Sequence, residues 1–278
     1  MPHTRQSFKA LQLKAKTEVH SSRLGEHLSR YHAQGHDFAE LREYHAGDDI
    51  RKIHWMTTAK LGKPYIKEFH AHRELSIVLA VFMDASLYFG SGNAKQERLC
   101  EIASLLGYAT IAHNDLFQGF CYTQEHNYST PPSKQAYDVA QFTQNLFELP
   151  LLGTTLDYKQ SLQMLFQSIP RPSLLFILSD CLEEIDLSLL AQKHEVVVIC
   201  IRDEAEHSQE ALGEVTLSNP HNHSHKEQTM GKKSIANYLA ILDKHDQASQ
   251  NKWRQNNIRH LCLTTQENVL AKLLAFFR

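Results

Sequence analysis

From residue 75 onward, short apolar runs alternate with longer stretches in which apolar residues recur at helical spacing. Most of the runs have strand length and are apolar on both faces, which is typical of parallel strands covered by helices on either side. We predict strands at residues 75–83, 116–122, 174–178, 195–201 and 258–263. This alternation predicts an α/β fold with a doubly wound, mainly parallel sheet and helices on both faces.

The helical stretches lie between these runs, at residues 94–113, 136–149, 156–168, 185–194 and 234–253. A short edge strand is expected at residues 127–131, where Pro131 and Pro132 would end it. Residues 5–19 also have helical spacing, whereas residues 20–73 are mixed and loop-rich. Since the apolar content of residues 1–73 is too thin for a core, we expect a helical and irregular extension that packs on a main domain of residues 74–278.

The amino-acid composition indicates what class of protein this chain belongs to. The chain has 278 residues, of which 42% are hydrophobic and 22% charged, as in ordinary soluble globular proteins. It has no apolar run of membrane-spanning length and no secretory signal, so we expect a cytoplasmic protein without direct membrane insertion. Residues 1–73 carry an excess of basic side chains, but no aromatic interleaving or binding motif accompanies them, and no nucleic-acid partner is expected.

Oxygen-bearing side chains follow two of the predicted strands. Asp84 ends the first apolar run, Asp180 follows the run at residues 174–178, and Gly153-Thr154 opens a helix between the two strands. Ligands of open α/β sheets bind beyond the carboxyl ends of the strands. If these two strands are neighbours, the three sites converge. Taken alone, either aspartate is more commonly a cap for the next helix or turn.

A second cluster precedes the first strand. It contains Arg42-Glu43-Tyr44, Gly47-Asp48-Asp49, Arg51 and Trp55. These residues resemble the signature of domain-of-unknown-function family 58. The resemblance continues through Ala59-Lys60, Lys67-Glu68-Phe69, Phe89-Gly90-Ser91-Gly92 and Leu178-Ser179-Asp180, and so covers nearly the whole chain. One departure is His54, where the family usually has an acidic residue before the tryptophan.

The resemblance implies a von Willebrand factor A-like fold with a metal-ion-dependent adhesion site. The residues that match this site by position are Asp84, Ser86, Thr154 and Asp180. The cofactor implied is Mg²⁺ or Mn²⁺, contacted directly by Ser86 and Thr154, since hard ions suit hydroxyl, carboxylate and water oxygens. Tyr88 replaces the second serine of the usual first loop. An alternative alignment through Phe89-Gly90-Ser91 also loses one ligand, so the site is degraded, and water would have to replace that ligand.

Two interpretations of the signature segment remain open. Its charged residues (Arg42, Glu43, Asp48, Asp49 and Arg51) can form a hydrogen-bonded network around the Gly47-Asp48 turn that holds the N-terminal part on the sheet. Tyr44 and Trp55 would then pack beneath the network. Alternatively, the segment is a surface that docks a partner. We favour the structural network.

The resemblance also implies a function class. Family members resemble partners of MoxR-type AAA+ ATPases, which suggests a non-enzymatic interaction module that acts with such an ATPase and its client proteins in maturation or assembly. The carboxyl rim of the sheet would be the docking face. The alternative is a metal-dependent hydrolase that uses Asp84 and Asp180, with Asp157 and Glu183 as the only further acids nearby. No catalytic triad or nucleotide-binding motif is recognisable, and we interpret the histidine-rich residues 221–225 as a solvated loop.

Overall fold

The computed structural model of the protein describes residues 2–28, 40–45, 48–50, 53–68, 75–90, 94–124, 127–210, 213–222 and 224–278. Its centre is a six-stranded sheet in the order β10-β7-β6-β3-β4-β5. All neighbouring strands are parallel except β4 and β5, which are antiparallel. The strands are β3 (Ser76–Phe82), β4 (Leu116–Tyr122), β5 (Tyr128–Ser129), β6 (Leu174–Ser179), β7 (Glu195–Arg202) and β10 (Arg259–Thr264).

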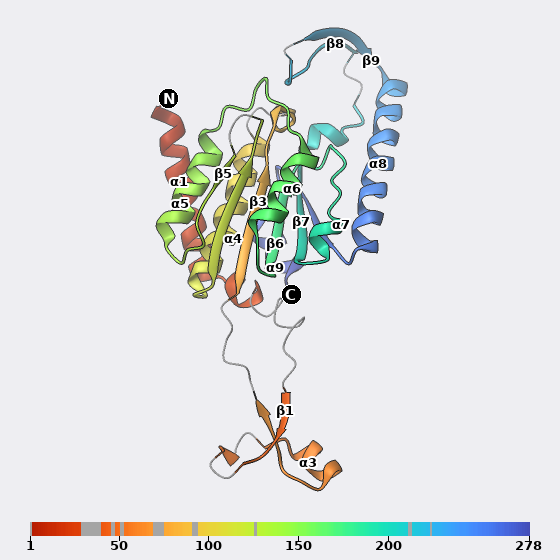
Figure 1. Ribbon diagram of the computed structural model, residues 1–278. Coiled ribbons are helices and arrows are strands. Elements are labelled where there is room, and N and C mark those ends of the chain that lie inside the picture. Colours follow the sequence, from red (N-terminus) through yellow and green to blue (C-terminus); the bar gives the residue numbers. More distant parts are fainter. Residues whose placement is uncertain are drawn as a thin grey trace.

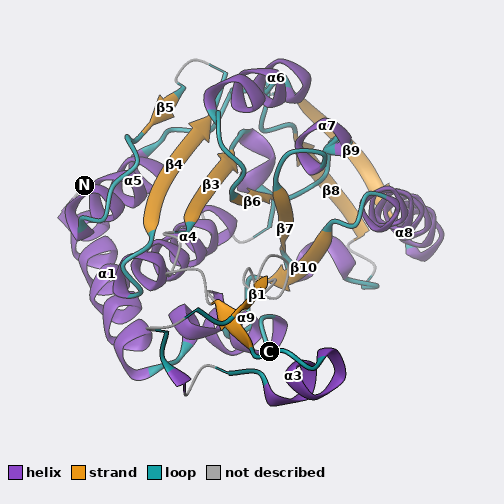
Figure 2. Cartoon of the chain, turned by 60° about the horizontal axis from the view of Figure 1, so that its bottom comes forward, coloured by secondary structure: helices purple, strands orange, loops and turns teal. Residues whose placement is uncertain are grey.

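The central strands are buried on both faces, as their continuous apolar sequences predict. Every residue of β6 is buried, and so is every residue of β3 except Ser76. Helices cover the sheet on both sides (Figure 2). One side carries α4 (Ala94–Ala112), α5 (Ala136–Glu148) and α9 (Val269–Phe276), and the other carries α6 (Tyr158–Ser168), α7 (Ser188–Ala191) and α8 (Lys232–Gln255). The predicted α/β fold, a doubly wound and mainly parallel sheet with helices on both faces, is confirmed.

The N-terminal residues form two structurally different parts. Helix α1 (Pro2–Ser21) packs on α4 and α5, with the rings of Phe8 and Phe147 5.1 Å apart. Strands β1 (Glu40–Glu43) and β2 (Tyr65–Glu68) pair antiparallel and, with α3 (Trp55–Leu61), form a small unit. In Figure 1 this β1–β2–α3 unit lies beyond the amino ends of the strands, at the opposite end of the domain from the carboxyl rim.

Two features differ from the sequence predictions. The helix expected at residues 185–194 is reduced to the single turn α7, because Ile185 and Leu187 are buried in irregular chain before it. An antiparallel hairpin of β8 (Gly213–Ser218) and β9 (His225–Met230) was not predicted. Residues 214–218 do alternate polar and apolar side chains, but β9 is polar except for Met230, and both strands are mostly exposed, so the pair lacks the apolar face that marks a half-buried hairpin.

Among the described helices, none is both long and apolar enough to cross a membrane.

Candidate functional site

The carboxyl ends of β3 and β6 lie side by side, as the sequence analysis required, because these strands pair directly. Asp84 caps the short helix η2 (Ala85–Tyr88) by accepting a hydrogen bond from the Ser86 amide at 2.8 Å. The Ser86 hydroxyl donates to Oδ2 of Asp180 at 2.6 Å, and Oδ1 of Asp180 accepts from the Leu182 amide. Three of the four predicted metal ligands therefore lie together, and both aspartates also act as local caps.

The fourth predicted ligand, Thr154, is directed into its own loop. Its hydroxyl donates to the carbonyl of Leu151 at 2.7 Å. Its carbonyl accepts from the Ala85 amide and lies 2.7 Å from Nδ1 of His221. Since a carbonyl only accepts hydrogen bonds, Nδ1 of His221 carries a proton in this contact. The neighbouring Gly153 amide donates to the carbonyl of Pro220. The turn of the β8–β9 hairpin is thus fastened onto the Thr154 loop, beside the rim.

Lys95 is the functional candidate that the sequence analysis missed. Its side chain is fully buried in the first turn of α4, and Nζ lies 3.2 Å from Oδ2 of Asp180 and 2.8 Å from Oε1 of Glu206. A basic residue in a first turn opposes the helix dipole. That unfavourable position was the available signal that Lys95 has another partner. Burial of an ammonium requires such carboxylates, because an unpaired charge in the interior is very unfavourable.

The ion pairs continue away from the sheet's centre. Arg202, at the end of β7, contacts Oε2 of Glu206 at 3.2 Å and Oδ1 of Asp246 on α8 at 2.6 Å. We call the connected side chains the rim network: Ser86, Asp180, Lys95, Glu206, Arg202 and Asp246. It links the loop after β3, the helices α4 and α8 and the ends of β6 and β7.

Burial raises the pKa of Asp84, and the nearby Asp180 carboxylate raises it further, whereas hydrogen bonds from Ser86 lower it. The net direction is upward, so a neutral carboxyl is favoured at Asp84 relative to an exposed aspartate. Asp84 is 4% exposed and Asp180 only 1%. These two carboxyls are therefore enclosed by protein rather than open to a partner or a substrate.

The side chains present do not fit the implied divalent ion well. One carboxylate oxygen of Asp180 already holds the Ser86 hydroxyl and the Lys95 ammonium, Thr154 is turned away, and Tyr88 replaces a serine. Across the described ranges, no three His, Cys, Asp or Glu side chains are grouped so that they could hold a metal ion. Binding of Mg²⁺ or Mn²⁺ at Asp84, Ser86, Thr154 and Asp180 stays a prediction.

The two further acids considered for hydrolysis have other surroundings. Asp157 caps α6 by accepting from the amide of Gln160 at 2.9 Å, and Glu183 is exposed in the loop after β6. Residues 221–225 are not simply a solvated loop, as predicted, because His221 reaches this rim from the β8–β9 hairpin and contacts the Thr154 carbonyl. Its charge lowers the pKa of Asp84 slightly, as the weakest of the contributions.

The signature segment lies in the β1–β2–α3 unit and not at the rim. The carboxylate of Asp48 accepts from the His45 amide at 2.8 Å, Glu43 pairs with Lys63 at 3.1 Å, and the Tyr44 amide donates to the Pro64 carbonyl. Gly47, Arg51 and the side chain of Arg42 lie outside the described residues. Asp49 is exposed and Tyr44 half-buried. The contacts described for this segment, Asp48 with His45 and Glu43 with Lys63, lie within the β1–β2–α3 unit.

The expectation that Trp55 packs beneath this network is wrong. Trp55 begins α3 and is 67% exposed. His54 precedes it as the helix cap, since Nδ1 of His54 accepts from the Thr57 amide at 3.3 Å. A helix cap needs a side-chain acceptor, and an imidazole nitrogen supplies one where the family usually has a carboxylate.

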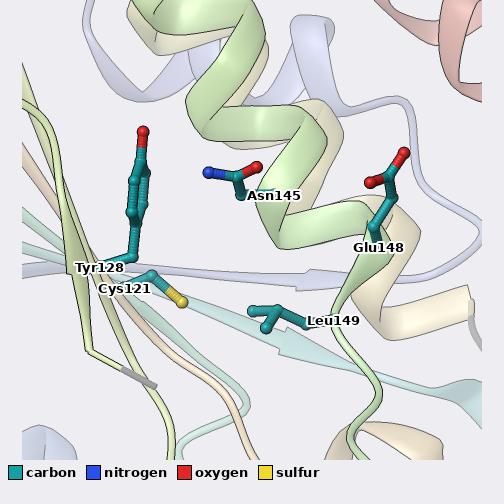
Figure 3. Close-up of a pocket in the computed structure, with 5 residues that line it drawn as sticks. All are labelled: Cys121, Tyr128, Asn145, Glu148 and Leu149. Carbon is teal, nitrogen blue, oxygen red and sulfur yellow. The ribbon is translucent and has the colours of Figure 1, made fainter.

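One cavity, of about 260 Å³, lies elsewhere, between the sheet edge and α5. Figure 3 shows the ring of Tyr128 and the amide of Asn145 on either side of it, with Cys121 and Leu149 below. The carboxylate of Glu148 points away from Cys121 in this view. Burial raises the pKa of Cys121 to about 12, so its thiol is protonated and unreactive at neutral pH. We assign no chemistry to this cavity.

Comparisons with known proteins agree with the sequence resemblance. An uncharacterized protein of Mycobacterium bovis and one of Mycobacterium tuberculosis are each 32% identical to the chain over 103 residues. The match covers 37% of this chain and 32% of each relative, so the chain spans about a third of the length of the relatives it matches.

Two solved structures have a similar arrangement at low identity. The conserved hypothetical protein BatB of Bacteroides thetaiotaomicron has a TM-score of 0.43 at 8% identity, covering 72% of this chain and 99% of BatB. An aerotolerance-related membrane protein of Bacteroides fragilis has a TM-score of 0.42 at 8% identity, covering 73% of this chain and 96% of that protein. The family described as "Protein of unknown function DUF58" matches residues 40–248, and the chain belongs to this family.

Proposed function

We propose that the chain is a non-enzymatic, cytoplasmic interaction module that acts with a MoxR-type AAA+ ATPase in the maturation or assembly of client proteins. The kind of partner follows from the family resemblance. The observation that carries the proposal is a group of large apolar side chains left exposed on the β1–β2–α3 unit. We place the docking surface there, which is the alternative interpretation of the signature segment.

The exposed residues lie close together in the chain. Ile50 is 62% exposed, Trp55 and Met56 are each 67% exposed, and Leu61 is 59% exposed. Helix α3 has no buried residue. Large apolar residues gathered on a surface mark interaction sites, and tryptophan in particular supplies much of the binding energy at protein interfaces. These exposures support docking through α3 and the preceding Ile50.

Other contacts maintain the local fold of this unit. The His54 amide donates to the Tyr65 carbonyl at 2.7 Å, and β1 pairs with β2 along its length. Gly62 ends α3 in the left-handed conformation, and its amide donates to the Thr58 carbonyl. Because none of these contacts uses the indole of Trp55 or the thioether of Met56, removal of either side chain tests binding rather than folding.

The rim is a poorer docking face than the sequence analysis expected. Asp180 is almost completely buried, and the Pro220-His221 turn is fastened to the Thr154 loop. The same enclosure argues against the metal-dependent hydrolase, because a substrate must reach the reacting groups. Sustained Mg²⁺-dependent turnover of a phosphoester, lost in Asp180→Asn, would favour the hydrolase over the module.

The test is a binding measurement with the MoxR-type ATPase of the same host. We expect the double variant Trp55→Ala, Met56→Ala to weaken binding at least about tenfold, since loss of two interface anchors removes more than about 1.4 kcal/mol. Binding is measured by calorimetry or surface plasmon resonance, with nucleotide present and absent, and folding by circular dichroism.

The matched control is Tyr137→Ala, Ile241→Ala. These two large side chains are 68% and 71% exposed on α5 and α8, away from the β1–β2–α3 unit. The control variant should bind like wild type. Wild-type affinity in the Trp55, Met56 variant would place docking elsewhere, and absence of binding by the folded wild-type chain would reject the ATPase as the partner.

A further inference from the structure

The site of the implied metal already contains a cation that belongs to the chain. Lys95 is fully buried, and its ammonium contacts both the Asp180 and Glu206 carboxylates. The ring of Phe89 lies 5.9 Å from Nζ. Carboxylates and an aromatic face are favourable surroundings for a cation, so these groups satisfy the ammonium where water cannot.

The hydrogen bonds around Asp180 fit an ammonium rather than a metal ion. Oδ2 of Asp180 accepts from the Ser86 hydroxyl at 2.6 Å and from Lys95 at 3.2 Å. Oδ2, which would ligate a metal ion, is therefore already engaged by the ammonium, whereas the Ser86 hydroxyl donates its proton to it and keeps its lone pairs. The Thr154 hydroxyl is likewise engaged with the Leu151 carbonyl.

We propose that the Lys95 ammonium replaces the divalent cation of the adhesion site, so that the rim is assembled without metal and does not exchange its cation. A bound ion can leave or accept a new ligand from a partner. A lysine anchored in α4 can do neither. The rim network then fastens the loop after β3 to α4 and to the ends of β6 and β7.

Lys95 also connects Asp180 to charged residues further away, which a single ion bound at Asp180 would not contact. Glu206 accepts from Lys95 through Oε1 and pairs with Arg202 through Oε2. Arg202 in turn holds Asp246 on α8. Both oxygens of Glu206 are therefore engaged by basic side chains, which is the condition under which a buried carboxylate is tolerated.

Removal of the lysine should convert the site into one that binds metal. Lys95→Ala leaves the Asp180 and Glu206 carboxylates beside a vacated space, with the Ser86 hydroxyl next to Asp180. Carboxylate and hydroxyl oxygens suit Mn²⁺ and Mg²⁺. Lys95→Met is the matched control, because the unbranched methionine fills the space without charge and leaves less room for an ion.

The experiment measures Mn²⁺ binding to the full chain by electron paramagnetic resonance, and the Tm with Mn²⁺ or with a chelator. Wild type should bind no Mn²⁺ at millimolar concentrations. Its Tm should be the same with Mn²⁺ as with a chelator. Lys95→Ala should melt lower than wild type in chelator and gain several degrees in Mn²⁺, whereas Lys95→Met should melt lower without that gain. Asp180→Asn added to Lys95→Ala should abolish the gain.

Two results would overturn the proposal. The first is Mn²⁺ binding by wild type that Asp180→Asn removes, because the metal and the lysine would then coexist. The second is Lys95→Ala with wild-type Tm in chelator, because the ammonium would then contribute nothing to the rim. If Lys95→Ala does not fold, the wild-type titration decides: absence of binding supports the proposal, and binding that depends on Asp180 overturns it.

Discussion

The hydroxyl of Ser86 donates a 2.6 Å hydrogen bond to Oδ2 of Asp180, a residue 94 positions further along the chain. The bond joins the loops that follow two neighbouring strands, β3 and β6. The contact is mostly enclosed by protein. Ser86→Ala should lower the free energy of unfolding by about 1–3 kcal/mol, because a buried carboxylate loses one of its donors. Urea denaturation measures the change.

Ser168→Ala is the control for this prediction. The Ser168 hydroxyl donates to the Met164 carbonyl within its own exposed helix turn, so its loss should change stability by less than about 0.5 kcal/mol. Equal effects of the two substitutions would mean that the Ser86–Asp180 contact contributes no more than an exposed serine does.

Gly90 should not tolerate a side chain. Its φ is +97°, and an added Cβ would lie 2.3 Å from Cγ of Asp203. Asp203 is itself buried, where it caps the turn Glu204–His207 and accepts from the Thr265 hydroxyl. We expect Gly90→Ala to destabilise the protein by more than about 2 kcal/mol, because backbone strain adds to the close contact.

Gly62→Ala separates the cost of backbone strain from the cost of the close contact with Asp203. Gly62 also has a positive φ, +70°, but an added Cβ there would meet nothing within 4 Å. Its substitution should cost about 1 kcal/mol from the backbone alone. The difference between the two variants, measured by thermal or urea denaturation, reports the contact with Asp203. If the two changes are equal, the Asp203 side chain moves aside at no cost.

His194 should make the fold sensitive to acid. Burial, reinforced by the positive charge of Lys193, lowers the pKa of His194 to about 4. Neither ring nitrogen has a hydrogen-bond partner among the described residues. Because the unfolded histidine titrates near its ordinary pKa of about 6.5, the neutral ring contributes its full stability above that pH, and this contribution is lost as the pH falls towards 4.

The measurement is the Tm of wild type and His194→Phe between pH 7.5 and about pH 4.5. Wild type should lose more stability than His194→Phe across this range, whereas the control His225→Phe, at an exposed position of β9, should follow wild type. Parallel pH profiles for wild type and His194→Phe would contradict the prediction.

Helix α1 should contribute to the stability of the main domain. Phe8 is buried against Phe147 of α5, and Lys14 pairs with Glu101 of α4 at 2.7 Å. Phe8→Ala should cost about 3 kcal/mol, as for other truncations of buried aromatic residues. Leu13→Ala, on the same helix but 66% exposed, should change stability by less than about 0.5 kcal/mol. If Phe8→Ala denatures like Leu13→Ala, α1 is not docked in solution.

The sequence by itself determined the sheet and the placement of its chemistry at one edge. The strands β3, β6 and β7 contain continuous apolar runs, and such runs are visible locally because burial on both faces leaves no polar position within them. Asp84 and Asp180 were found for the same reason, since each directly follows a run. The helices α4, α5 and α8 were recognised from their spacing to within two residues at each end.

Only the tertiary structure decided what those aspartates contact and what the signature segment does. Lys95 appears in the sequence as an ordinary charged residue of a first helical turn, and its carboxylate partners lie in the segments that follow β6 and β7, more than eighty residues away. The tertiary structure also leaves Trp55 exposed at the start of α3, and it brings His221 to the rim through a hairpin that was not predicted. Local patterns record whether a position is buried, but the pairing of buried charges depends on contacts between distant segments.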